Sequence, residues 1–128
     1  MRVAVVVLAL LLGCMPRARV VTAAKLLQDP ARFDGAHVVI AGRVVDLRMR
    51  APEQGNAYTS FLLADGTARL SVFGWGKLDV DPGDLVEVRG EFHSLAHAGS
   101  DTLPDTLEAS FVRRVAHGPQ LPGPIGPP

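Results

Sequence analysis

Hydrophobic and polar residues alternate most clearly in residues 57–75, AYTSFLLADGTARLSVFGW, and this pattern predicts a β-hairpin. Asp65-Gly66 separates two β-favouring runs. Asp-Gly in this position predicts a type I′ turn, because both central residues of that turn need a positive φ. In steps of two from the turn, one face is assigned to the core: Thr59, Phe61, Leu63, Leu70 and Val72. The opposite face carries Tyr58, Ser60, Leu62, Arg69, Ser71 and Phe73, with Trp75 just beyond it.

Three other segments have strand patterns. Residues 37–46, HVVIAGRVVD, are apolar on both faces around Gly42, as expected of a barrel strand that bends and serves two sheets. Residues 85–92 alternate strictly, and residues 107–115 form the last predicted strand. The positions predicted to point inward are Val38, Ile40, Val44, Val86, Val88, Phe92, Leu107, Ala109, Phe111 and Val115.

The remaining segments predict one short helix and several loops. Thr22 is placed to cap a helix over residues 23–28, and Pro30 prevents a longer one. Residues 29–35 are expected to form a turn. Residues 50–56 and 93–106 contain the Gly, Ser, Asn, Asp and Pro residues typical of exposed loops.

Size and composition indicate one β-rich domain without a general basic surface. The 128 residues contain thirteen Lys and Arg against thirteen Asp and Glu, so a broad nucleic-acid-binding field is not expected. A single Cys excludes an intramolecular disulfide. Residues 117–128 are rich in Pro and Gly and predict a disordered tail.

The first fourteen residues, MRVAVVVLALLLGC, have one positive charge and an apolar run too short to span a bilayer, as in a secretory signal. Leu11-Leu12-Gly13-Cys14 resembles the lipobox of bacterial lipoproteins. The resemblance implies a signal peptide over residues 1–13, a lipidated Cys14, a tether over residues 14–21, and a place on the periplasmic side of the bacterial cell envelope. An ordinary signal peptide, or a buried first strand with a free Cys, is the alternative.

Three segments, LLQDPARFDGAHVVIAGRVVD, FLLADGTARLSVFGW and DPGDLVEVRGEF, resemble bacterial OB-fold domains akin to the tRNA-anticodon-binding and periplasmic OB families. The resemblance implies an all-β fold over residues 22–116, a five-stranded Greek-key barrel with a short N-terminal helix. In OB-folds the second and third strands and the adjoining loops bind ligands. The residues this assigns to ligand binding are Tyr58, Ser60, Leu62, Arg69, Ser71, Phe73, Trp75, Arg48 and Arg50.

Two functions remain open from the residues. The first is a non-catalytic binding module on a lipoprotein, with an envelope ligand or protein as its partner; the second is single-stranded nucleic-acid binding by aromatic stacking. A third interpretation of the hairpin face is that Tyr58, Leu62 and Phe73 only pack under the N-terminal helix or the tail. No catalytic motif is present, so neither an enzyme nor a cofactor is expected.

Two polar clusters are candidate metal ligands. His93, His97 and Asp101 are spaced four apart, but Gly99 and Ser100 argue against the helix that would align them. The aspartates at positions 79, 81 and 84 do not follow the spacing of a calcium-binding loop. Both clusters are therefore expected to be solvated side chains without a metal.

Overall fold

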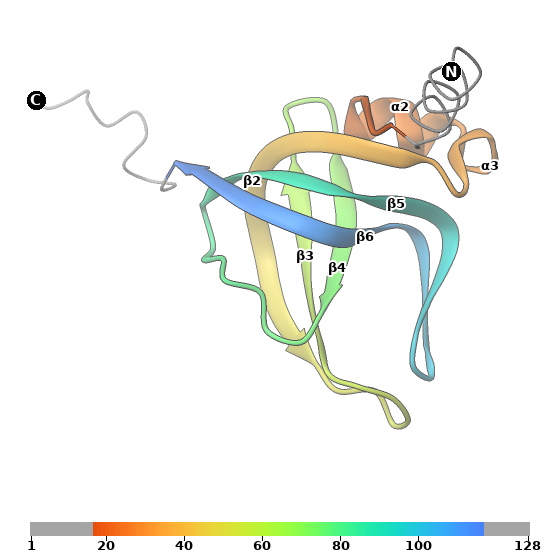
Figure 1. The fold of residues 1–128 in the computed structure, drawn as a ribbon, viewed down its shortest axis with the longest axis vertical. Coiled ribbons are helices and arrows are strands. Elements are labelled where there is room, and N and C mark those ends of the chain that lie inside the picture. The colour runs from red at the N-terminus through yellow and green to blue at the C-terminus, as the bar shows by residue number, and fades with distance from the viewer. Residues whose placement is uncertain (1–16, 117–128) are drawn as a thin grey trace, which may run out of the picture.

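Five long strands close into a barrel, and two short helices lie at one end of it (Figure 1). The computed structural model describes residues 17–116. The elements in chain order are β1 (Arg19–Val20), α2 (Ala23–Gln28), α3 (Pro30–Phe33), β2 (His37–Arg50), β3 (Tyr58–Ala64), β4 (Arg69–Trp75), β5 (Leu85–Ala98) and β6 (Asp101–Ala116). The all-β prediction is confirmed. The expected signal peptide, Cys14 and residues 117–128 lie outside the described residues.

Strand β2 closes the barrel because it pairs with both β5 and β3, while β1 adds a short parallel pairing at its start. Its first half runs antiparallel to β5 and its second half antiparallel to β3, and Arg43 pairs with both. Gly42 lies at this corner, where an added Cβ would meet the carbonyl oxygen of Ala64 at 2.7 Å. On the other side β4 and β6 pair in parallel over three residues each. The two-sheet role predicted for residues 37–46 is therefore confirmed.

The β3–β4 hairpin is confirmed, but its turn differs from the prediction. Leu63 pairs with Leu70, and the Asp65 N–H donates to the Ala68 carbonyl, so the central residues are Gly66 and Thr67. Of the two residues predicted to form the centre of the turn, Gly66 has a positive φ of 92°, whereas the φ of Asp65 is not positive. The assignment of Asp65-Gly66 to a type I′ turn is thus wrong. The predicted inward face is confirmed as buried: Thr59, Phe61, Leu63, Leu70 and Val72.

Residues 93–106 form a β-hairpin rather than the predicted exposed loop. Strands β5 and β6 stay paired out to Ala98 and Asp101 and form an arm that projects beyond the barrel (Figure 1). Ala96 and Ala98 are buried against Tyr58 and Phe73 in a second small apolar cluster. The segment is ordered because its small side chains cover these aromatic rings, a contact that turn-forming residues do not reveal.

A β-bulge overturns part of the prediction for the last strand. Arg89 pairs with Phe111 and Gly90 with Ala109, so Ser110 is an extra residue in β6. The side chains beyond the bulge therefore exchange faces. Leu107 is buried as predicted, but Phe111 and Val115 are 50% and 42% exposed. Val112 packs against the core in their place.

The helices cover the end of the core that lies near the start of β2. Thr22 caps α2 by accepting a hydrogen bond from the Lys25 N–H at 3.2 Å, as predicted. The expected turn at residues 29–35 contains a further short helix, α3, which buries Phe33. Leu26 and Phe33 join the barrel core. None of the helices among residues 17–116 is long and apolar enough to cross a membrane.

Candidate ligand-binding site

A cleft of about 620 Å³ lies over the outer face of β3 and β4, between this face and the arm. Strand alternation places the outward residues of β3 and β4 along its floor. The arm supplies the other wall, and loop residues 51–57 contact the tip of the arm through Gln54. The lining residues are Asp46, Arg50, Tyr58, Ser60, Leu62, Ser71, Val72, Phe73, Ser100, Asp101, Thr102, Leu103, Pro104 and Thr106.

The aromatic residues of this face form a packed cluster. Tyr58 and Phe73 are 2% and 1% exposed, and their rings meet edge to face with centroids 5.8 Å apart. Trp75 contacts both rings in the same manner, and 44% of this residue is exposed. Stacking on a base requires an open ring face. Tyr58 and Phe73 are therefore too buried to serve as a stacking platform.

Two loops that flank the cleft are joined to each other. The Gln54 N–H donates to the Ser100 hydroxyl at 3.0 Å, and the Ser100 N–H donates to the Gln54 carbonyl at 2.7 Å. Gly55 and Gly99 meet so closely that a Cβ on Gly55 would lie 2.5 Å from the Gly99 Cα. The loop after β2 is thus clasped to the tip of the arm, and the cleft is closed at that end.

Tyr58 attaches the floor of the cleft to the arm. Its phenol donates a hydrogen bond of 2.6 Å to Asp101 Oδ2. Burial raises the pKa of Tyr58 to about 12, and the hydrogen bond to Asp101 and the negative charge of Asp101 add to the rise. Tyr58 therefore remains neutral over the physiological range and keeps its proton on the side of Asp101.

The cleft brings charges of both signs together. Arg50 donates to the Ser60 hydroxyl at 3.3 Å, and Asp46 and Asp101 supply carboxylates. Asp46 also accepts a hydrogen bond of 2.9 Å from Arg48. The remaining polar lining consists of the hydroxyl groups of Ser60, Ser71, Ser100, Thr102 and Thr106. Such a lining offers hydrogen bonds and one cation, without the row of cations typical of a nucleic-acid channel.

The structure brings six of the nine predicted binding residues to the cleft. These are Arg50, Tyr58, Ser60, Leu62, Ser71 and Phe73. Arg48, Arg69 and Trp75 are not among the residues that line it. Residues 100–106, which form a wall of the cleft, were expected there as part of an adjoining loop, and the prediction missed that the segment is a β-strand. The small residues Ala96 and Ala98, two positions apart on either side of His97, were the available signal for a strand packed on one face.

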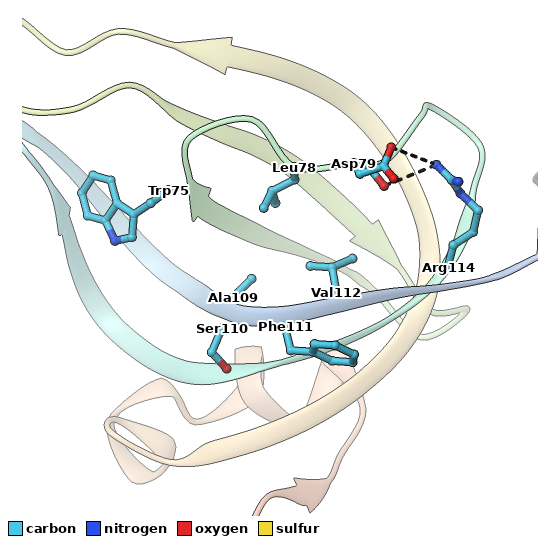
Figure 2. Close-up of a pocket in the computed structure, with 8 residues that line it drawn as sticks. All are labelled: Trp75, Leu78, Asp79, Ala109, Ser110, Phe111, Val112 and Arg114. Atoms are coloured by element: carbon cyan, nitrogen blue, oxygen red, sulfur yellow. Dashed lines mark hydrogen bonds and ion pairs between the residues drawn. The ribbon is translucent and has the colours of Figure 1, made fainter.

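A second hollow, of about 410 Å³, lies where β6 separates from β4 (Figure 2). Ala109 and Val112 point toward Leu78, whereas Ser110 and Phe111 point away, as the bulge requires (Figure 2). Arg114 lines one end of this hollow. Its Nε donates to Asp84 Oδ2 at 2.8 Å, and its Nη2 lies 3.7–3.8 Å from the carboxylates of Asp81 and Asp79. A guanidinium thus occupies the centre of the aspartate cluster seen in the sequence.

The other candidate metal cluster is dispersed. His93 Nε2 lies 3.2 Å from Glu108 Oε1, and Asp101 accepts from Tyr58. Glu108 also accepts a hydrogen bond of 3.2 Å from the Trp75 indole. Within residues 17–116, no group of three or more His, Cys, Asp or Glu side chains is arranged to hold a metal ion.

Comparisons with solved structures identify the fold as an OB-fold. A chain from Leishmania major Friedlin, provisionally assigned as an aspartyl-tRNA synthetase, matches with a TM-score of 0.59, 12% identity and coverage of 81% of this chain and 22% of that one. RecG bound to a three-way DNA junction matches with a TM-score of 0.56 and 18% identity, and the match covers 78% of this chain and 13% of that one. The OB domain of Ta0387 from Thermoplasma acidophilum matches with a TM-score of 0.51 and 17% identity, and the match covers 75% of this chain and 86% of that one.

The chain therefore spans about a fifth of the synthetase chain and most of the Ta0387 domain. No protein-family model and no curated protein sequence matches it. At these identities the likeness concerns the fold alone, because one fold carries many functions.

Proposed function

We propose that this chain is a non-catalytic OB-fold binding module that holds a short polar peptide in the cleft over β3 and β4. The observation that carries the proposal is the closure of the cleft by the two hydrogen bonds between Gln54 and Ser100. A long polymer that crosses the face would have to separate these loops, whereas a short ligand enters beside them.

The chemistry of the lining favours a peptide that carries a positive and a negative charge. The guanidinium of Arg50 suits a carboxylate, and Asp46 and Asp101 suit an ammonium group. The hydroxyl groups donate to and accept from peptide groups, and Leu62 and Leu103 offer apolar contact between them. Concave sites with a few placed polar groups on an apolar floor are typical of small-ligand binding.

Trp75 is the single Trp of the chain, and its contacts with Tyr58 and Phe73 make its fluorescence a reporter of the cleft. We expect a tetrapeptide of glycine, alanine and serine with free termini to cause a saturable change in this fluorescence. Blocking both termini should abolish the change. Arg50→Gln should weaken binding roughly tenfold, because a charge-assisted hydrogen bond is lost. Arg69→Gln is the matched control, since Arg69 is exposed on β4 and does not line the cleft.

Single-stranded nucleic acid is the alternative ligand, as the fold of RecG, which was solved with a DNA junction, suggests. Arg48, Arg50 and Arg69 are exposed near the β3–β4 face and favour it modestly. An oligothymidylate that quenches Trp75 in a salt-sensitive manner, with no response to the tetrapeptide, would refute the peptide proposal in favour of this alternative. No response to the tetrapeptide at millimolar concentration would also refute it.

We further propose that the module is displayed on the periplasmic side of the cell envelope through acylated Cys14. The lipobox-like segment and the apolar run before it support this placement. Protein purified from bacterial membranes should have an intact mass that corresponds to cleavage before Cys14 plus acyl chains. The Cys14→Ser variant should lack the acyl mass. An unprocessed, unacylated wild-type chain would contradict the anchor while leaving the cleft proposal in place.

A further inference from the structure

Three cations surround a hollow of about 410 Å³ at the helical end of the barrel. Arg19 comes from β1, Lys25 from α2 and Arg32 from α3, and all three are exposed. Short elements of the N-terminal segment thus bring together basic residues that are up to thirteen positions apart in the sequence. The full lining of the hollow is Arg19, Val20, Val21, Thr22, Lys25, Arg32 and Phe33, without a carboxylate.

Phe33 contacts two of the cations. The guanidinium carbons of Arg19 and Arg32 lie 5.6 Å and 5.5 Å from the centre of its ring, and the ring itself is buried. Both arginines therefore gain cation–π contacts. Their positive charges repel each other in this arrangement, and a bound anion would relieve the repulsion.

Protein carboxylates do not neutralise this cluster. Among the Arg and Lys side chains of residues 17–116, Arg48, Arg113 and Arg114 make ion pairs with Asp, Glu or both, whereas Arg19, Lys25 and Arg32 make none. The acidic residues of the N-terminal segment also make no ion pair with these three cations. Asp34 accepts hydrogen bonds from the amide and the hydroxyl of Ser94. The hollow therefore offers three cations to an external anion.

We propose that this surface, made of Arg19, Val20, Lys25 and Arg32, rests on a membrane and binds the phosphate groups of anionic phospholipids. Guanidinium groups bind phosphate oxygens through paired hydrogen bonds, and Lys adds a point charge. Val20 is 85% exposed beside them. A protruding apolar side chain among cations suits the boundary between headgroups and acyl chains, and it has no partner on a nucleic-acid backbone.

The position of the surface in the chain agrees with a membrane partner. Arg17 follows Cys14 by three residues, and three residues span at most about 10 Å. If Cys14 is acylated as proposed above, the basic surface cannot be far from the headgroups. Figure 1 shows α2 and α3 at the opposite end of the barrel from loop residues 51–57. The inferred orientation therefore directs loop residues 51–57 away from the membrane.

Vesicle sedimentation tests the surface without the anchor. The chain from residue 15 to residue 128 retains all the described strands and helices and lacks Cys14. We expect it to bind vesicles that contain phosphatidylglycerol, to bind phosphatidylcholine vesicles at least tenfold more weakly, and to dissociate in high salt. Arg19→Gln, Lys25→Gln and Arg32→Gln together should lower the partition coefficient about 100-fold, because each cation contributes to attraction at an anionic surface.

The matched control removes three cations elsewhere. Arg48→Gln, Lys77→Gln and Arg113→Gln change the net charge equally and should alter vesicle binding less than threefold. Equal losses in the two triple variants, or equal binding to both kinds of vesicle, would overturn the proposal. So would binding of an oligonucleotide through the same three residues without binding to vesicles. Because this chain carries no acyl group and is tested without peptide, failure here is distinct from failure of the anchor or of the cleft.

Discussion

Replacing Asp65 with alanine is expected to lower the free energy of unfolding by about 3 kcal/mol, because one carboxylate holds both the turn of the hairpin and the start of α2. Its Oδ1 accepts from the Thr67 N–H and hydroxyl at 2.9 and 2.6 Å and from the Ala68 N–H at 3.2 Å. Its Oδ2 accepts from the Ala23 N–H at 2.8 Å. Alanine would leave these donors without a protein acceptor.

Denaturant unfolding of the chain that begins at residue 15 measures this loss, and hydrogen exchange should show reduced protection at Ala23. Asp29→Ala is the control, because Asp29 flanks both helices without a side-chain capping bond, and it should change stability by less than about 0.5 kcal/mol. If Asp65→Ala were as mild as this control, the connection between turn and helix would have no role in stability.

Lowering the pH should remove the stabilisation that the Asp65 carboxylate provides. Burial alone would raise the pKa of Asp65, but the hydrogen bonds from Thr67, Ala23 and Ala68 lower it below its ordinary value. A depressed folded-state pKa means that the contribution is present above the unfolded value of about 3.9 and disappears as the pH falls through the folded value. The stability difference between wild type and Asp65→Ala should therefore shrink below about pH 4.

Tyr58 is expected to ionise with a pKa of about 12 in the folded protein, as against about 10 in denaturant. It is the single Tyr of the chain, so the ultraviolet absorbance of phenolate reports this one group. Because the folded-state pKa is raised, the stabilisation from neutral Tyr58 is fully present below about pH 10 and is lost as the pH rises through about 12.

Substitutions separate the causes of this shift. Asp101→Asn should lower the pKa of Tyr58, since the charge of Asp101 disappears, but should leave it above 10 because burial is the larger cause. Asp46→Asn, which removes another carboxylate of the cleft without a bond to Tyr58, should leave the pKa unchanged. An ordinary pKa in the native protein would mean that the arm does not stay closed on the β3–β4 face.

The local pattern of the chain was sufficient for the elements that lie directly against the core. Alternation identified the inward faces of β3 and β4, and the apolar corner at Gly42 identified the strand that serves two sheets. The Thr22 cap was also evident from residue type. These features depend on neighbours in sequence or on the two-residue period of a strand, so a single segment contains the information.

The candidate site was predicted in part for the same reason. Period-two counting brought Ser60, Leu62 and Ser71 to one face, and the structure places all three in the cleft. The opposite wall was expected as a loop, and its two paired strands were missed, because Gly99, Ser100 and Pro104 have the local preferences of a loop. Long-range packing of Ala96 and Ala98 on the aromatic cluster overrides those preferences.

The sequence by itself thus determined the all-β barrel, its short capped helix and the composition of the β3–β4 face. Only the tertiary structure decided which residues share a site. It moved the hairpin turn by one residue, inserted Ser110 as a bulge and joined Gln54 to Ser100. It also gathered three cations around one hollow. The physical reason is that these arrangements follow from contacts between distant segments, whereas residue preferences and periodicity describe only each segment in isolation.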